Sequence, residues 1–199
     1  KVNDQFEKSV KALSSERKKL AQKLEKAVSQ EMKHLGFAAS GFSIAMNPIE
    51  PGAEGGESVE FMVSLNPGAP GGPLRKIASG GELSRVALAL KSVLAKGDDM
   101  PSMVFDEIDT GIGGETGEAV AKTLGELAGI KQILLVTHLH QIAKEGNSHF
   151  TVTKKVADEK TTVLIEAVQG KAREKEIARM LGATGSEGLS FARSILREK

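Results

Sequence analysis

The chain has 199 residues, and its 27 Lys and Arg against 26 Asp and Glu give a formal net charge of only +1. This balance excludes nucleic-acid binding through overall charge, so any such surface must be a local patch. No apolar run approaches the roughly 20 residues of a membrane span, and the lack of Cys fits a reducing cytoplasm, so we expect a soluble protein with no membrane partner. Because the chain begins without Met inside a helical pattern, we expect it to be a piece of a longer protein.

Residues 1–35 are expected to form one helix. They contain no Gly or Pro and are rich in Lys, Glu, Ala and Leu, which favour helices. Phe6, Leu13, Leu20 and Ala27 recur every seven residues, which is the spacing of a coiled-coil seam. We favour the end of a coiled-coil arm with a mildly basic face. The alternative is a solitary amphipathic helix with a solvated face.

Two alternating stretches after this helix predict a β-hairpin. Gly36 is expected to end the helix. Residues 42–46 and 58–65 alternate between apolar and polar, as half-buried strands do, and residues 51–57 between them have the composition of a loop. The Pro- and Gly-rich stretch 66–73 is expected to be a connector rather than a phosphate-binding loop.

A capping box predicts a second helix, which starts after Ser79 and ends near Gly97. Ser79 and Glu82 have the required spacing, since the Glu stands three residues after the cap. The apolar residues at helical spacing should form its buried face, namely Leu83, Ala87, Leu90 and Leu94.

The first turn of this helix contains two glycines, Gly80 and Gly81. Glycine costs a helix stability but lets a ligand approach the backbone closely. Unpaired N–H groups and the positive end of the helix dipole favour an anion at this place. An ordinary capped helix accounts for Ser79 and Glu82 but not for the glycine pair, so we favour a phosphate contact.

Three carboxylates follow the apolar run 103–105, and they are Asp106, Glu107 and Asp109. The run predicts a buried strand, and ligands bind at the carboxyl ends of strands in open α/β sheets. Carboxylates at such an edge can hold a hard cation and orient a water, as phosphate-ester chemistry requires. Two alternatives are a solvated strand end without function and a metal-dependent nuclease site.

A strand–helix–strand unit is expected around this position. Residues 115–128 read as a helix and residues 132–136 as another buried strand, which predicts a parallel pair. His138 follows the second strand and should lie beside Asp106 and Glu107 at the same sheet edge. We reject a zinc site at His138 and His140 because no third ligand stands at a suitable spacing.

The last 50 residues predict a second hairpin and two helices. The hairpin strands are expected at 149–156 and 161–168, and the helices at 171–181 and 186–197. Their Lys and Arg side chains are most simply explained as solvated faces. Together with the parallel pair, these elements predict an α/β fold.

In this order and spacing the motifs resemble the C-terminal half of an ABC-type ATPase head of the SMC-like group. Residues 78–85 are similar to the signature motif, 104–107 to the end of Walker B, 108–114 to the D-loop and 136–139 to the switch-histidine loop. The resemblance implies the C-terminal lobe of a P-loop ATPase head with a parallel sheet core, preceded by a coiled-coil helix. It covers almost the whole chain, with the arm at 1–35 and the head at 36–199.

Residues 79–85, 106–114 and 137–143 carry a more specific resemblance, to a bacterial DNA repair protein of this group. One departure is His140, where the usual family form has Pro. No G-x-x-x-x-G-K-[ST] pattern occurs in the chain. In the family, this Walker A motif belongs to the N-terminal half of the head, so we expect this chain to be inactive alone.

The resemblance also implies roles for single residues, with ATP and Mg²⁺ as cofactors. Asp106 would help to hold Mg²⁺, usually through water, and Glu107 would polarise the attacking water. His138 would contact the γ-phosphate, and Asp109 would couple two sites across a dimer. The helix start would complete the site on the ATP of the opposing head, through Ser79, Gly80, Gly81 and Glu82.

The implied function is ATP binding and hydrolysis between two heads, which controls association with DNA during double-strand break repair and recombination. Its implied partners are the N-terminal Walker A half, a second head, and double-stranded DNA or DNA ends, in the bacterial cytoplasm at the nucleoid. The rival is a structural tether that dimerises through head and coiled coil and bridges DNA ends without hydrolysing ATP. Glu107 argues against this rival, because a tether has no need of a water-activating carboxylate.

Overall fold

The computed structural model describes residues 2–37, 41–65, 68, 71–157, 160–183 and 185–197. The chain divides into two compact units. The first unit contains residues 1–101 together with 106–110, and the second contains 102–105 and 111–199. Among the helices described, none is long and apolar enough to cross a membrane.

The first unit begins with the helix α1, Val2–His34, which confirms the single helix predicted for the first 35 residues. The helix ends as expected at Gly36, whose φ of 91° lies in the left-handed region that glycine tolerates. The N–H of Phe37 donates to the carbonyl of Met32 at 3.0 Å, and the N–H of Gly36 donates to Lys33 at 3.3 Å. These two bonds form a Schellman motif, which satisfies the last carbonyls of α1 and fixes the position of Phe37.

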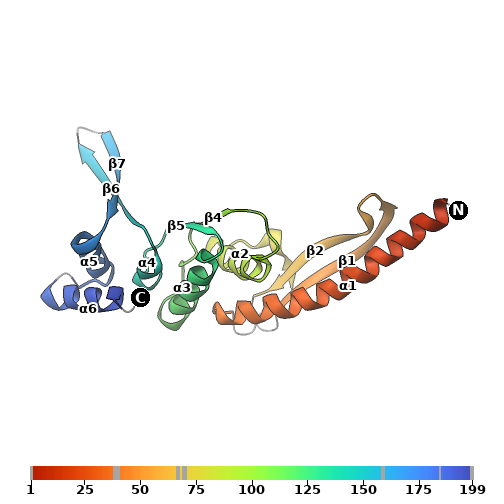
Figure 1. Cartoon of the computed structure of the whole chain (residues 1–199), viewed down its shortest axis with the longest axis horizontal. Coiled ribbons are helices and arrows are strands. Elements are labelled where there is room, and N and C mark those ends of the chain that lie inside the picture. Colours follow the sequence, from red (N-terminus) through yellow and green to blue (C-terminus); the bar gives the residue numbers. More distant parts are fainter. Residues whose placement is uncertain are drawn as a thin grey trace. The chain divides into compact units, whose positions relative to one another are not determined.

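A three-stranded antiparallel sheet lies beside α1 (Figure 1), with β1 Gly41–Gly52, β2 Gly55–Ser64 and β3 Gly72–Pro73. The predicted hairpin is confirmed, but the predicted loop at 51–57 is wrong. Gly52 pairs with Gly55, so the turn is short and most of that stretch is strand. Within the expected connector 66–73, Gly72 and Pro73 form β3, while residues 66, 67, 69 and 70 lie outside the described residues.

The core of the first unit forms where the end of α1 packs on this sheet and on α2. Val28, Met32 and Leu35 are completely buried at that end of α1, and the rings of Phe42 and Phe61 lie 5.3 Å apart. Polar groups fix the same contact, because Ser29 Oγ accepts from the N–H of Phe42 at 3.0 Å. The other end of α1 keeps its apolar side chains largely in solvent.

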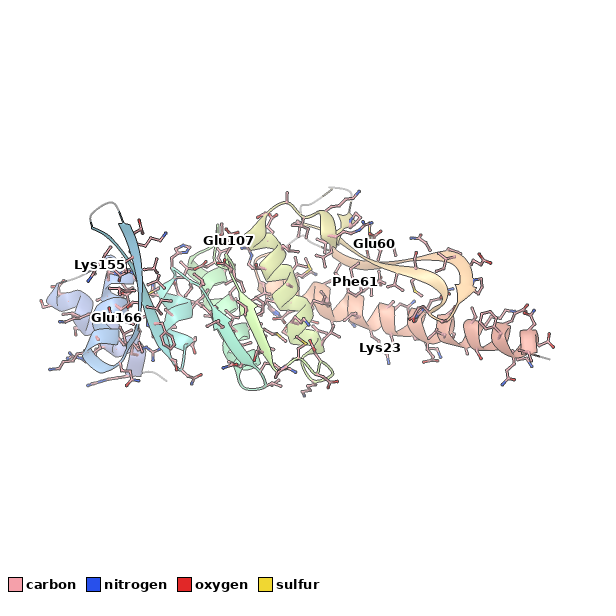
Figure 2. All side chains as sticks on the ribbon, turned by 90° about the horizontal axis from the view of Figure 1, so that it is seen from above. Lys23, Glu60, Phe61, Glu107, Lys155 and Glu166 are labelled. Carbon is pink, nitrogen blue, oxygen red and sulfur yellow. The ribbon has the colours of Figure 1, made fainter. Side chains whose placement is uncertain are left out.

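An apolar groove of about 560 Å³ runs along α1, between that helix, the hairpin and α2. Lys23 and Phe61, labelled in Figure 2, are two of its lining residues. Leu20, one of the four heptad residues, also lines it and is 61% exposed. Part of the predicted coiled-coil seam therefore lies open on the first unit.

The short 3₁₀ helix η1, Leu74–Lys76, leads to α2, Gly80–Leu94. The start of α2 after Ser79 is confirmed, but its predicted buried face is wrong. Leu83 and Leu94 are exposed, and the buried residues are Gly81, Arg85, Val86, Leu88 and Ala89. Because α2 is apolar on most sides, periodicity alone could not choose the face that its packing partners cover.

The second unit contains the predicted strand–helix–strand unit, with β4 Ser102–Phe105, α3 Gly114–Ala128 and β5 Gln132–Leu135. The strands are parallel and Phe105 pairs with Leu135, which confirms the predicted arrangement. The expectation that both strands are buried is only half right. Met103 and Phe105 are buried, whereas Val104 and Leu134 on the opposite face are 70% and 60% exposed.

The rest of the second unit contains α4 His140–Glu145, β6 His149–Ala157, β7 Lys160–Val168, α5 Gly170–Met180 and α6 Ser186–Arg197. The β6–β7 hairpin and both terminal helices are as predicted; Figure 2 labels Lys155 on β6 and Glu166 on β7. Ala143, Ile177, Ala178 and Ala192 form a core that joins α4, α5 and α6.

Candidate functional site

The three predicted carboxylates lie in the segment Asp106–Thr110, which we name the acidic loop. Asp106 and Glu107 are exposed (Glu107 is labelled in Figure 2), whereas Ile108 and Asp109 are buried. Asp106 Oδ1 accepts the N–H of Glu107 at 2.9 Å, and the carbonyl of Glu107 accepts the N–H of Thr110 at 3.0 Å. The loop is therefore a closed turn that presents two adjacent carboxylates to solvent and holds the third inside.

The backbone of Glu107 has a φ of 56°, in the left-handed region. It is the only residue other than glycine with a positive φ in the part of the chain that the structure describes. For a residue with a Cβ this conformation costs about 1–2 kcal/mol, and it persists only where surrounding contacts impose it. Strain of this kind is concentrated at functional sites, so it singles out Glu107 among the acidic residues.

The first turn of α2 packs directly against the acidic loop. A Cβ added at Gly80 would overlap with Glu107 Oε2. A Cβ added at Gly81 would lie 3.0 Å from the backbone oxygens of both Glu107 and Thr110. Ser84 Oγ donates to the carbonyl of Asp106 at 2.8 Å. Close packing thus gives the glycine pair a structural purpose in addition to the phosphate contact predicted from sequence.

Arg85 holds the acidic loop through hydrogen bonds to its backbone. Its side chain is only 7% exposed, and Nη1 donates to the carbonyl of Thr110 at 3.0 Å, with a longer contact of 3.5 Å to that of Ile108. Burial lowers the pKa of the guanidinium from its usual value, and the nearby charge of Glu82 partly offsets this. Sequence reasoning missed Arg85; the available signal was a cation on the same helical face as Gly81, one turn further on.

The start of α2 remains accessible beside this packing. Ser79 and Gly80 are exposed, and Ser79 Oγ accepts the N–H of Glu82 at 3.4 Å, which confirms this half of the predicted capping box. A helix N-terminus attracts anions through its N–H groups and its dipole. Within the first unit, the structure therefore brings an anion-attracting helix start next to two exposed carboxylates.

His138 lies in the second unit, in the turn between β5 and α4. Thr137 Oγ1 accepts the N–H of Leu139 at 3.0 Å, so a side-chain cap shapes the turn that carries His138. His138 is exposed, whereas the neighbouring His140 is half-buried. Burial lowers the pKa of His140; the charge of Glu118 opposes this shift and that of Lys144 adds to it. The two histidines thus have different environments, and His138 is the accessible one.

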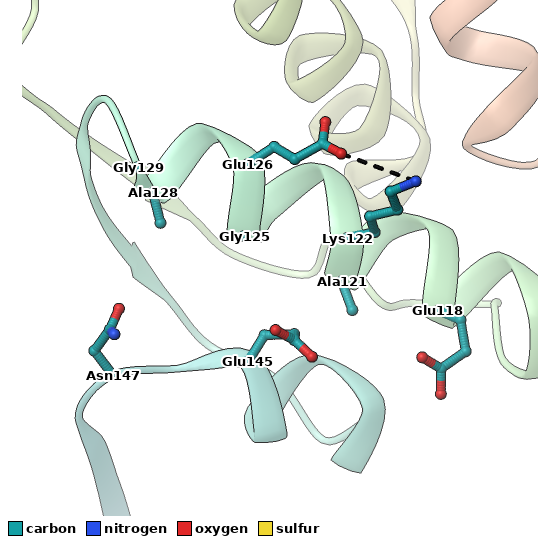
Figure 3. Close-up of a pocket in the computed structure, with 9 residues that line it drawn as sticks. All are labelled: Glu118, Ala121, Lys122, Gly125, Glu126, Ala128, Gly129, Glu145 and Asn147. Atoms are coloured by element: carbon teal, nitrogen blue, oxygen red, sulfur yellow. Dashed lines mark ion pairs between the residues drawn. The ribbon is translucent and has the colours of Figure 1, made fainter. Parts of the chain in front are cut away.

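A pocket of about 580 Å³ lies between α3 and α4 in the second unit (Figure 3). Its lining includes Glu118, Glu126 and Glu145 but only one cation, Lys122, which lies 4.0 Å from Glu126. None of the residues predicted for the site lines it. Like charges repel, so a pocket with three carboxylates does not suit the phosphates of a nucleotide.

The curated proteins similar to this chain include DNA repair proteins called RecN from several bacteria. The chain is 40% identical over 198 residues to RecN of Xylella fastidiosa strain Temecula1, 42% over 196 to that of Treponema pallidum, and 43% over 187 to that of Deinococcus radiodurans. The matches cover 97%, 94% and 93% of the chain. The chain is a homologue of part of RecN. It spans only about a third of these relatives, 36%, 34% and 33% of their lengths, at their C-terminal end.

Solved structures place the fold of the chain with the heads of SMC proteins. The Smc head domain of Pyrococcus furiosus, solved with an extended coiled coil, matches with a TM-score of 0.56 and 19% identity, over 83% of the chain and 39% of that protein. The Smc head domain of Pyrococcus yayanosii matches with a TM-score of 0.54 and 19% identity, over 88% of the chain and 28% of that protein. No protein-family model matches the chain. The predicted α/β fold and its relation to SMC heads are confirmed, together with the specific resemblance to RecN.

Proposed function

We propose that the chain is the C-terminal part of an ATPase head that acts in DNA double-strand break repair and recombination. In the complete protein, ATP is bound and hydrolysed between two heads, and the nucleotide state controls association with DNA. One observation in the first unit supports this proposal. The start of α2, which resembles the signature motif, packs against the loop with the two exposed carboxylates.

The residues present fit the proposed cofactors ATP and Mg²⁺. Asp106 offers an exposed carboxylate, the oxygen ligand that Mg²⁺ prefers, and we propose that it holds the ion through water. When bound, Mg²⁺ would supply neutralisation of the phosphate charge. Ser79, Gly80, Gly81 and Glu82 at the start of α2 would present N–H groups and a cap to the phosphates of the opposing head's ATP.

Glu107 is the proposed catalytic carboxylate. It would orient a water and take up its proton, which is the role of a general base. Its closed turn and its contact with Gly80 restrict where the carboxylate can lie. Such restriction helps phosphoryl transfer, which depends mostly on positioning. We keep His138 as the γ-phosphate ligand and Asp109 as the residue that couples two sites, on the resemblance of their motifs alone.

The proposed partners follow from the length of the chain relative to RecN. The chain spans about a third of those relatives, so the preceding part would supply the Walker A motif that this sequence lacks. A second head would complete each site, and double-stranded DNA or DNA ends would be the target, in the bacterial cytoplasm at the nucleoid. We propose residues 1–35 as the end of a coiled-coil arm, because Phe6, Leu13 and Leu20 are exposed along α1.

The variant Glu107→Gln tests this function in the full-length protein. It keeps the size and most contacts of the side chain but removes the general base, so ATP affinity should stay within about twofold while turnover falls about 10²- to 10⁴-fold. Nucleotide binding and phosphate release are the measurements. Glu115→Gln is the matched control, since Glu115 is exposed in the first turn of α3 and outside the acidic loop.

Other outcomes separate the alternatives. Normal turnover by Glu107→Gln would contradict the assignment of the base. A wild-type protein that binds ATP but never hydrolyses it, even with linear DNA, would favour the tether. Metal-dependent cleavage of DNA without ATP would favour a nuclease. Hydrolysis by the 199-residue chain alone would contradict the proposal that the preceding part supplies the Walker A motif.

A further inference from the structure

Arg85 is an unusual buried cation in the first unit, because its hydrogen bonds go to backbone carbonyls and its guanidinium lies over a ring. Nη1 reaches the carbonyls of Ile108 and Thr110, and Nε is buried without a hydrogen-bond partner. Burying a charge whose hydrogen bonds go only to neutral groups is costly, so we expect Arg85 to have a purpose beyond packing.

Arg85 also contacts Phe37. The guanidinium carbon Cζ lies 5.1 Å from the centroid of the Phe37 ring, within range of a cation–π interaction. Phe37 is the residue that closes the Schellman motif of α1 through its N–H bond to Met32. The backbone of Phe37 is therefore fixed relative to the last turn of α1, and the residue is buried, with 6% exposure.

These contacts form a continuous series within the first unit. The end of α1 fixes Phe37, the ring of Phe37 lies against Arg85, and Arg85 holds the carbonyl of Thr110. The N–H of the same Thr110 donates to the carbonyl of Glu107. Thr110 is therefore bound through its carbonyl by Arg85 and through its N–H by the turn of Glu107. Moving the end of α1 would move the partner of Arg85, and through it the acidic loop.

We infer that Arg85 is a positioning residue that, together with Phe37, couples the end of α1 to the acidic loop and so sets the placement of Glu107. This rests on the proposed function as far as hydrolysis is concerned. The coupling itself is a property of the protein without nucleotide. A change at α1 therefore reaches the carboxylates through the side chains of Phe37 and Arg85.

The test uses the full-length protein and four variants. Arg85→Met removes the donors but keeps the length of the side chain, Arg85→Lys keeps one charged donor group, and Phe37→Leu removes the ring but leaves the Arg85 donors. Arg75→Met is the matched control, since Arg75 is an exposed cation of the same unit that is paired with Glu60 at 2.7 Å. The readouts are hydrogen exchange of amides 106–110 without nucleotide, the thermal unfolding temperature, and kcat and KM for ATP.

Arg85→Met should speed exchange of the Thr110 amide by at least about tenfold and lower kcat by at least about tenfold, with KM within about threefold of wild type. Phe37→Leu should speed the same exchange by about threefold or more, and Arg85→Lys should lie between Arg85→Met and wild type. Arg75→Met should leave all four measurements as in wild type. If Arg85→Met does not fold, Arg85→Lys and Phe37→Leu still decide the question.

Unchanged exchange in Phe37→Leu would overturn the coupling to α1, and unchanged exchange in the Arg85 variants would overturn the positioning of the loop. Parallel loss of kcat and affinity would show a general structural defect and would also overturn it. If the wild-type protein does not hydrolyse ATP, the proposed function fails, but the exchange measurements still decide whether Arg85 and Phe37 control the loop.

Discussion

Single residues explain why the acidic loop has its shape. Glu107 adopts a left-handed backbone because the loop must turn sharply between a strand end and a buried segment. Gly80 and Gly81 remove the two Cβ atoms that would otherwise occupy the space of this turn. The Glu107 carboxylate and its strained backbone pack against the glycine pair of α2. Each of these residues can be tested separately.

The two glycines should respond differently to Ala. At Gly80 the new methyl group would meet only the carboxylate end of Glu107, which can rotate away, so stability should change by less than about 1 kcal/mol while turnover falls. At Gly81 it would press on two backbone oxygens, which cannot move freely, so unfolding should cost about 1–3 kcal/mol less. Urea unfolding measures both, and Gly125→Ala on α3, where only Glu145 Oε2 lies near at 3.8 Å, is the control. Equal destabilisation at both sites would contradict this account.

At the scale of elements, the junction of α4, α5 and β6 depends on Arg173. Its Nη2 donates to three carbonyls at the end of α4, those of Ala143, Lys144 and Gly146, at 3.3, 3.0 and 2.7 Å. A cation at the C-terminal end of a helix satisfies carbonyls that lack intrahelical partners and favours the helix dipole. The short helix after His138 is therefore held from its far end by α5.

This junction also predicts a pH dependence. Burial and the charge of Arg173 lower the pKa of His149 from its usual value, while Glu176 opposes the shift; burial likewise lowers that of His140. As the pH falls, these two histidines therefore bind protons in the unfolded chain before they do so in the folded protein. The contribution of these histidines to folding stability should be fully present above the usual His pKa of about 6.5. It should be lost as the pH falls through the lower pKa of the folded state.

Thermal unfolding between pH 8 and 5 measures this dependence. His149→Asn should flatten the curve in that range. Hydrogen bonds from Arg179 and Arg193 lower the pKa values of Glu176 and Glu174, and the stability that these carboxylates contribute is lost only at more acidic pH. A wild-type curve that is flat from pH 8 to 5 would contradict the role of the histidines.

Across the whole molecule, the order and type of the main elements could be predicted from sequence because periodicity, caps and turns act locally. The carboxylates and the glycine pair of the site could be located for the same reason. The buried face of α2 could not, since several of its faces are apolar and only its partners decide which one is covered. Arg85 escaped prediction because it binds backbone carbonyls 23 and 25 residues away, and its place on the helical face of Gly81 does not reveal those partners.

One face of the β4–β5 pair carries exposed apolar side chains. Val104, Leu134 and Val136 are exposed there, yet parallel sheets are normally covered on both faces. We expect the preceding part of the full-length protein to cover this face. Adding that part in trans should slow amide exchange at 132–136 by at least about tenfold. Val104→Glu should prevent this effect and Ile130→Glu, at another exposed apolar position, should not; equal association of both variants would contradict the prediction.

The path of the chain through the acidic loop has a consequence for evolution. The loop belongs to the first unit, but β4 before it and α3 after it belong to the second. Peptide bonds anchor it at both ends. Between them, Ser84 and Arg85 bind its backbone carbonyls and Gly81 packs closely against it. An inserted or deleted residue would break one of these attachments. Length variation among homologous chains should therefore occur in the hairpin turns and be absent from residues 105–111.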